Sequence, residues 1–218
     1  PEGGVLPSPW FVMEVCPGVL LSTLRDGLDP AQQLTVDTQT VRHLASMHAI
    51  GGPGFGRPAA GGSHPTWSGA FAELIDDLLA DGTDAGVDLP VPVTSIRDLV
   101  ARSTDALDEV RSPRLVHWDV WDPNVFVDPA SLRVVGIIDF ERVLWADPLM
   151  EAQFVAKRAD DELIAAYGSP LFEAPGATRR RRLYDLYLYL VMIIESSYRN
   201  YETDDIESFA RLCLDGVL

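Results

Sequence analysis

Cysteine and lysine are scarce in this 218-residue sequence, which has only Cys16, Cys213 and Lys157 of these two types. Two cysteines cannot build a disulfide framework or a cysteine-based zinc site, so we expect a reducing compartment. The longest apolar run, residues 186–194, is far shorter than the roughly 20 residues that a membrane helix needs. No charged and then apolar leader opens the chain. We therefore expect a cytoplasmic protein that does not enter membranes.

Basic residues are also few, because 17 Lys and Arg stand against 33 Asp and Glu, for a formal net charge of −16 at pH 7. Such a charge repels the phosphates of nucleic acid and of anionic membranes, so we expect neither as a partner. It is compatible with a cationic small molecule, although surface acids also serve solubility alone. With 47% apolar residues, the chain can bury the core of one large domain or two small ones.

Apolar periodicity predicts an α+β fold that is predominantly helical. Helical spacing and capping signals predict helices at residues 35–50, 67–80, 95–110 and 182–201. A short strand is expected at residues 10–15, ahead of the breakers Pro17 and Gly18. The Gly/Pro-rich stretch 51–67 is predicted to be a loop bordering a site. It has neither the G-x-G-x-x-G spacing nor the P-loop pattern, the two glycine motifs that cradle phosphates.

A β-hairpin is predicted at residues 124–139, where the apolar runs "NVFV" and "RVVGIID" flank the turn formers "DPASL". If the turn is centred between Ser131 and Leu132, Asn124 faces Asp139 at the open end. Their oxygens would then lie at a cross-strand distance of about 5 Å, which suits a hard cation. A decorated surface turn would explain Asp128 but not a carboxylate at the end of an apolar strand.

Asp119 comes five residues before Asn124, in a tight loop after a short apolar strand. Phosphoryl transfer needs one carboxylate to accept a proton, and an amide and a second carboxylate to hold Mg²⁺. Because Mg²⁺ takes only one or two protein carboxylates and completes its shell with phosphate oxygens and water, a site with two protein ligands is sufficient.

The pattern His117-x-Asp119-x-x-x-x-Asn124, followed by Ile138-Asp139-Phe140, resembles the catalytic loop and metal-binding motif of the aminoglycoside phosphotransferase family, which are relatives of protein kinases. Three further segments are similar to the family's hinge, to its core helix and to the segment after the metal motif: "FVMEVCPG" at 11–18, "LASMHAI" at 44–50 and "WADP" at 145–148.

This resemblance implies a role for each matched residue. Asp119 would be the base that accepts the proton of the substrate hydroxyl, and Asn124 and Asp139 would bind Mg²⁺. The backbone at Glu14 and Cys16 would meet the adenine edge of ATP, the co-substrate.

Two further matched residues are expected to be structural. His117 would orient the loop rather than carry a proton, since Asp119 already occupies the position of the base. Asp147 would brace the catalytic loop.

The resemblance covers only the C-terminal lobe, with a hinge-like segment at 1–18 and the lobe at 19–218. Glu141 replaces the usual glycine, and Lys157 follows the metal motif, so it cannot be the lysine that contacts ATP. We therefore expect a lobe without its N-terminal nucleotide lobe, from an ATP-dependent enzyme that phosphorylates a hydroxyl group of a small molecule.

Two alternatives stay open. A catalytically incomplete lobe could bind a ligand or partner without transferring phosphate. A metal-dependent hydrolase could use His117, Asp119 and Asp139 as ligands, but no second histidine stands at ligand spacing.

The sequence does not identify the substrate among aminoglycosides, other antibiotics, choline-like alcohols and sugars, and it leaves the oligomeric state open. Acidic clusters at 76–84 and 204–207 are either a solvated face or a surface for a cationic substrate.

Overall fold

Helices dominate the chain in the computed structural model, which describes residues 14–151, 161–168, 171–199 and 205–217. Small antiparallel sheets accompany them in these ranges, so the predicted α+β class is confirmed. The helices are α1 (Pro30–His48), α2 (Trp67–Asp84), α3 (Val93–Ala101), α4 (Thr104–Leu107), α6 (Asp161–Tyr167), α7 (Ala177–Ser196) and α8 (Asp205–Asp215). The strands are β1 (Val19–Leu20), β2 (Arg114–Val116), β3 (Val125–Asp128), β4 (Arg133–Ile137) and β5 (Leu144–Ala146).

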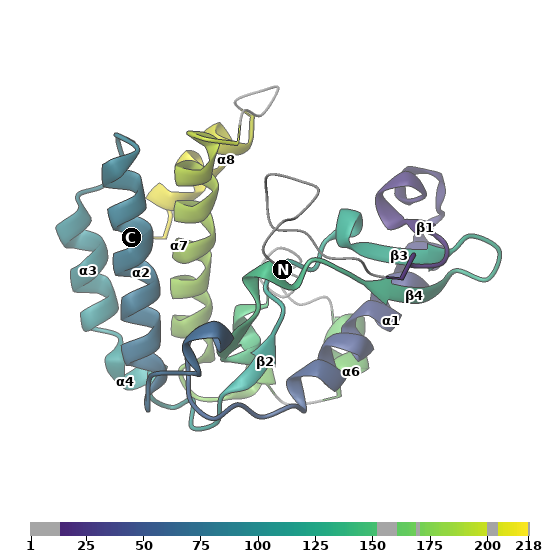
Figure 1. Cartoon of the computed structure of the whole chain (residues 1–218), viewed down its shortest axis with the longest axis horizontal. Helices are drawn as coiled ribbons and strands as arrows, with labels where there is room; N and C mark the ends of the chain where they lie inside the picture. The colour runs from purple at the N-terminus through teal and green to yellow at the C-terminus, as the bar shows by residue number, and fades with distance from the viewer. Residues whose placement is uncertain (1–13, 152–160, 169–170, 200–204, 218) are drawn as a thin grey trace, which may run out of the picture.

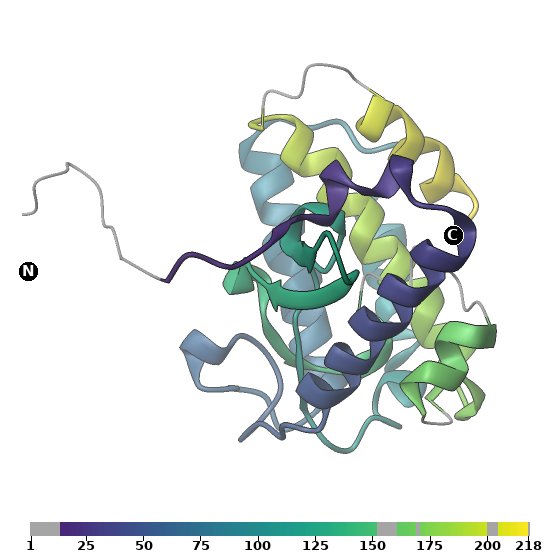
Figure 2. The same ribbon diagram turned by 90° about the vertical axis from the view of Figure 1, so that its right-hand side faces the viewer.

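Figure 1 shows these elements in two groups. Helices α2, α3, α7 and α8 form a helical group, and α1, α6 and the sheet β1-β3-β4 form a second group. Strand β2, which pairs with β5, lies between the two groups. Figure 2 shows α1 crossing the molecule beside the β3–β4 hairpin, which it contacts along β4.

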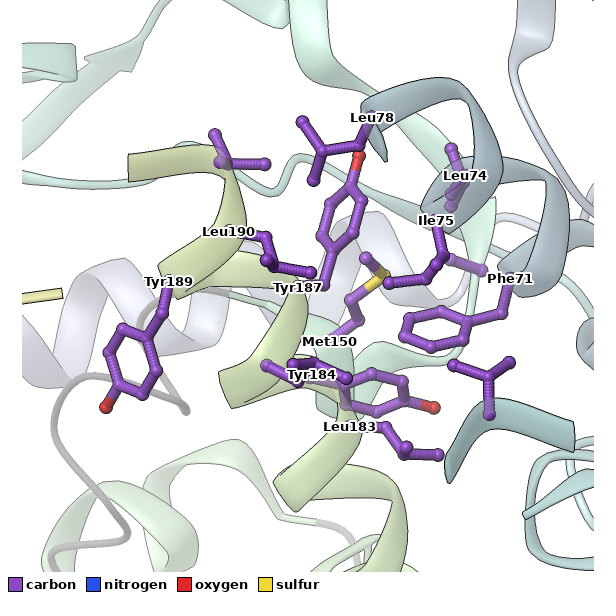
Figure 3. Packing of buried hydrophobic residues seen from close by; sticks show 14 of the residues in the cluster. Phe71, Leu74, Ile75, Leu78, Met150, Leu183, Tyr184, Tyr187, Tyr189 and Leu190 are labelled. Atoms are coloured by element: carbon purple, nitrogen blue, oxygen red, sulfur yellow. The ribbon is translucent and has the colours of Figure 1, made fainter. Parts of the chain in front are cut away.

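The core of the helical group lies between α2 and α7 (Figure 3), where Phe71 packs edge-on against the Tyr184 ring with their centroids 5.6 Å apart. Gly82 allows the two helices to approach closely, since a Cβ atom there would lie 2.9 Å from Cδ1 of Ile194. The second group has its own core of buried aliphatic residues beneath the hairpin: Leu21, Val36, Leu44, Val120, Val125, Val127 and Val134.

Several predicted helices have different ends in the structure. Helix α1 begins at Pro30 rather than at residue 35, because Asp29 and Gln32 form a capping box that stabilises an earlier start. The predicted helix 95–110 is interrupted at Ser103, which separates α3 from α4. Helix α7 begins at Ala177, so the arginine run 179–182 lies within its first turns.

The predicted register of the hairpin is wrong. Asp128 Oδ1 accepts hydrogen bonds from the N–H groups of Ala130 and Ser131, which shifts the turn toward the start of the segment. A bulge between Phe126 and Val127 then changes the pairing along the ladder. Asn124 consequently lies opposite Ile138, whose N–H donates to its carbonyl oxygen at 3.0 Å. Asp139 therefore lies one residue beyond the position opposite Asn124, where it was predicted to be.

Other predictions concern segments that the structure describes only in part. The predicted strand at 10–15 lies mainly outside the described residues, and Glu14 and Val15 are in no strand. The stretch 51–67 is largely a loop, which includes a short 3-10 helix at Pro58–Ala60. None of the described helices combines the length and the apolar character that crossing a membrane requires.

Candidate functional site

Two loops on either side of the β3–β4 hairpin form the candidate site. Residues 117–124 connect β2 to β3, and residues 138–143 connect β4 to β5. Because β2 pairs with β5 and β3 pairs with β4, hydrogen bonding at both ends holds the two loops next to each other. The structure therefore brings together the segments that carry Asp119, Asn124 and Asp139, as predicted, although the register differs.

Each loop contains a non-glycine residue in the left-handed backbone region. Trp118 has φ of 64° and Asp139 has φ of 69°. Such a conformation costs roughly 1–3 kcal/mol and persists only where surrounding contacts enforce it. Residues of this kind cluster at active sites, so their presence on both loops independently supports the assignment of a site here.

Asp119 is half-buried and held by the side chain of Asn124. The Nδ2 atom of Asn124 donates to Oδ2 of Asp119 at 3.1 Å and to its backbone carbonyl at 2.9 Å. Burial raises the pKa of the Asp119 carboxyl above its usual range, and the charge of Asp139 raises it further. Arg142, His117 and the Asn124 hydrogen bond partly counteract this rise in pKa. A desolvated carboxylate has a stronger tendency to take up a proton, as a general base must.

The chemistry of Asn124 and Asp139 is compatible with a magnesium ion. Because Nδ2 of Asn124 is engaged with Asp119, its Oδ1 remains as an acceptor, and Asp139 is exposed. Both groups offer the hard oxygen atoms that Mg²⁺ prefers. Within the described ranges, no group of three or more His, Cys, Asp or Glu side chains could hold a metal without other ligands. An ion here would thus need additional oxygens, such as those of a phosphate group.

His117 connects the two loops. Its ring is fully buried, and Nε2 lies 3.0 Å from the carbonyl oxygen of Ile138. Its Nδ1 accepts a hydrogen bond from the N–H of Asp119 at 3.2 Å, which assigns the proton to Nε2. Phe140 packs edge-on against the ring at 4.4 Å. With both nitrogens engaged, His117 fits a positioning role and is poorly suited to bind a metal, which weakens the hydrolase alternative.

Glu151 is a positioning residue that sequence reasoning missed. It is fully buried, and its carboxylate accepts the backbone N–H groups of His117 at 3.1 Å and of Trp118 at 2.9 Å. The Nε2 atom of His48, from α1, lies 3.4 Å from the same carboxylate. This carboxylate therefore anchors the backbone of the loop 117–124 where Trp118 adopts its positive φ.

The hydrogen bonds of Asp147 run to the helical group, and its predicted role in bracing the loop 117–124 stays a prediction. Asp147 is buried, and its carboxylate accepts hydrogen bonds from Arg180 Nε at 2.8 Å and the Tyr184 hydroxyl at 2.7 Å, both on α7. It also caps its own turn through the N–H of Leu149. Asp147 thus joins the segment after β5 to the helical group, while Glu151, four residues later, contacts the loop itself.

Arg142 is a second residue that the motifs did not identify. Its Nη2 atom forms a bidentate pair with the carboxylate of Glu195 on α7, at 2.7 and 2.8 Å. Its guanidinium carbon lies 5.5 Å from the centroid of the Trp118 ring, and its Nε lies 3.8 Å from Oδ2 of Asp119. No sequence motif could reveal this link, because Glu195 follows 53 residues later.

Glu14 and Cys16, predicted to contribute backbone groups to nucleotide binding, lie at the start of the described chain. Glu14 is exposed. Cys16 lies against Gly136 of β4, where any side chain at position 136 would collide with its sulfur atom. The segment is therefore placed along β4, and its contact with a nucleotide stays a prediction.

Comparison with known proteins identifies the fold. The apo structure of a thermostable mutant of aminoglycoside phosphotransferase APH(4)-Ia is 21% identical with a TM-score of 0.61, and the match covers 93% of this chain and 69% of that one. A ternary complex of a further variant of that mutant with AMP-PNP and hygromycin B is 22% identical with a TM-score of 0.60, over 92% and 68% of the two chains.

Choline kinase LicA from Streptococcus pneumoniae is also similar, with 16% identity and a TM-score of 0.58 over 87% of this chain and 65% of that one. These similarities place the chain in the kinase-like fold of its neighbours. The model of the phosphotransferase enzyme family APH matches residues 2–184, which is most of the sequence. The chain therefore belongs to the APH phosphotransferase enzyme family.

Proposed function

We propose that this chain takes part in the ATP-dependent phosphorylation of a hydroxyl group on a small molecule. The observation that carries the proposal is the pairing of Asp119 with Asn124 beside the loop of Asp139, at the meeting point of two strand pairs. The AMP-PNP and hygromycin B complex and the choline kinase among the neighbours support the same class of reaction.

In this proposal Asp119 orients the acceptor hydroxyl and takes its proton. Burial favours proton uptake by Asp119, while the Asn124 amide fixes the direction of the carboxylate. Asn124 Oδ1 and the Asp139 carboxylate would hold Mg²⁺, which, when bound with ATP, neutralises charge on the transferred phosphoryl group. Positioning of this kind accounts for most of the catalysis in phosphoryl transfer.

The test is a calorimetric titration of Mg·ATP into the chain, with Asp139→Ala as the ligand variant. Glu141→Ala is a matched control, because it removes one carboxylate from the same loop at an exposed position paired with Arg199 at 3.7 Å. We expect binding in the parent chain and in Glu141→Ala, and none in Asp139→Ala. Equal affinity in all three would refute the role of Asp139.

A second measurement distinguishes the enzyme from a module that only binds a ligand or partner. Transfer of labelled phosphate from ATP to a panel of alcohols supports the enzyme and requires Asp119. Nucleotide binding without transfer to any alcohol would favour a module that binds without catalysis.

A further inference from the structure

A cavity of about 400 Å³ adjoins the catalytic loop on the side of the helical group. Its walls come from four places: residues 57–59 of the Gly/Pro-rich loop, Leu74 of α2, Tyr187 of α7, and the segment 140–144 with Trp118. Trp118 directly precedes Asp119, and Arg142 in the wall has its Nε 3.8 Å from Oδ2 of Asp119. A molecule lodged in this cavity would therefore have one end close to the carboxylate of Asp119.

We propose that this cavity holds the body of the acceptor, and that the acceptor is a hydroxyl compound with an apolar or aromatic face and at most one positive charge. This inference rests on the proposed function, since it names the substrate class of the same site. Two properties of the wall carry it, namely its apolar surface and the pairing of its charges.

The wall is mostly apolar and partly aromatic. Four of its lining residues, Leu74, Trp118, Leu144 and Tyr187, are each at least nine-tenths buried. The rings of Trp118 and Tyr187 have their centroids 5.0 Å apart and are tilted against each other. The Tyr187 hydroxyl is neutral at pH 7, and burial raises its pKa further, to about 12. Such a surface gains affinity by removing apolar ligand area from water.

The carboxylates around the cavity already have cationic partners. Arg57 pairs with Asp77 at 2.7 Å and lies 3.9 Å from Glu73. Arg142 pairs with Glu195, as described above, and Glu141 lies 3.7 Å from Arg199.

A polycationic aminosugar needs unpaired carboxylates, and here it would have to displace guanidinium groups that then repel it. A neutral or singly charged acceptor meets no such cost. Although the whole chain has a negative net charge, the carboxylates around this cavity are ion-paired.

A matched pair of variants isolates the cavity. Ala59 and Ala60 are adjacent exposed residues of one short 3-10 helix, but only Ala59 lines the cavity. Ala59→Trp would fill the cavity, and Ala60→Trp adds the same ring outside it. Because both positions are exposed, neither substitution disturbs a packed core.

Three probes differ in charge: 2-phenylethanol, 2-amino-1-phenylethanol and the diamine 2-deoxystreptamine. Dissociation constants are measured for each by ligand-observed NMR on the parent chain and both variants. We expect the two aromatic alcohols to bind at least tenfold more tightly than the diamine. Their binding should weaken tenfold or more in Ala59→Trp and stay within twofold in Ala60→Trp.

Tighter binding of the diamine, unchanged binding in Ala59→Trp, or no binding of the aromatic alcohols to the parent chain would each overturn the inference. The measurement contains no nucleotide, so it stands apart from the Mg·ATP titration. A chain that fails that titration but binds the aromatic alcohols loses the proposed function and keeps the cavity.

A second pair of variants tests the charge argument. Arg57→Ser removes a cation from the wall, and Arg97→Ser removes an equivalent cation that pairs with Asp76 at 2.7 Å outside the cavity. Arg57→Ser should improve the affinity for 2-deoxystreptamine relative to 2-phenylethanol about fivefold or more. Arg97→Ser should leave that ratio unchanged. The same ratio in both variants would contradict the charge argument.

Discussion

Replacing Glu151 with Gln is the most informative test of how the loop 117–124 is held. The carboxylate accepts two backbone N–H groups, from His117 and Trp118, in a fully buried position. A glutamine keeps the shape of the side chain, but its amide presents N–H groups to one of these donors. One charge-assisted hydrogen bond, worth about 1.5–3 kcal/mol, is lost, and the other is reduced to an ordinary bond of about 1 kcal/mol.

Part of this loss is offset, because a neutral amide costs less to bury than a carboxylate. We therefore expect Glu151→Gln to lower the free energy of unfolding by about 3 kcal/mol, or Tm by about 6–12 °C for a chain of this size. Because one of the two backbone N–H groups at His117 and Trp118 then loses its acceptor, the loop is held less firmly, and transfer activity should fall more than the unfolded fraction explains.

Urea denaturation followed by circular dichroism measures the stability, and phosphate transfer at a temperature where the variant is folded measures the activity. Glu109→Gln is the control, since Glu109 is a partly exposed partner of Arg180 away from the loop. Parent-like stability and activity in Glu151→Gln would refute the argument that this carboxylate holds the loop.

Asp119→Asn should reduce phosphate transfer about 10²–10⁴-fold while sparing nucleotide affinity. Because burial raises the pKa of Asp119, its ionised form destabilises the native state, so the variant should be more stable than the parent at neutral pH. Urea titrations should show this difference in the free energy of unfolding at pH 7 and its loss at pH 3, below the unfolded pKa of about 3.8. Gly54→Ala should destabilise the fold by about 1–3 kcal/mol because its Cβ would collide with the backbone of Gly62, whereas Gly27→Ala, which meets nothing within 4 Å, should be close to neutral in thermal unfolding. Burial raises the pKa of Tyr187 to about 12, so the contribution of its neutral form to stability is complete below the unfolded pKa of about 10 and is lost as pH rises to 12. In Tyr187→Phe, the free energy of unfolding measured by circular dichroism should therefore fall less between pH 10 and pH 12 than in the parent chain.

The local parts of the site were predictable from the sequence because short loops between paired strands keep neighbouring residues together. Asp119 and Asn124 are five residues apart, and their hydrogen bonds form within one loop. The hairpin register was not predictable by counting from a turn centre, since an Asx-type turn at Asp128 and a bulge each change the pairing.

The long-range parts of the site had no local signal. Glu151 contacts backbone groups 33 and 34 residues earlier, and a buried glutamate accepting N–H groups leaves no pattern in its own neighbourhood. The contacts of Asp147 with Arg180 and Tyr184 on α7 likewise span more than 30 residues and have no local signal. A side chain's direction depends on packing between elements, which spacing along the chain does not reveal.

The contacts around the strained residues join the two loops into one rigid unit. Trp118 is held by Glu151, and the loop of Asp139 is tied to the first loop through His117 and Ile138. Two positive-φ residues together cost roughly 2–6 kcal/mol, which these buried hydrogen bonds must exceed for both loops to keep their shape.

Arg142 extends this rigid unit to the helical group. Its pair with Glu195 is largely shielded from solvent, with side chains 18% and 14% exposed, so salt screens it less than a surface pair. The same guanidinium lies in the wall of the proposed acceptor cavity and 3.8 Å from the Asp119 carboxylate. An acceptor that moved Arg142 would change the charge next to the proposed base, and acceptor binding and proton uptake would then be coupled through this side chain.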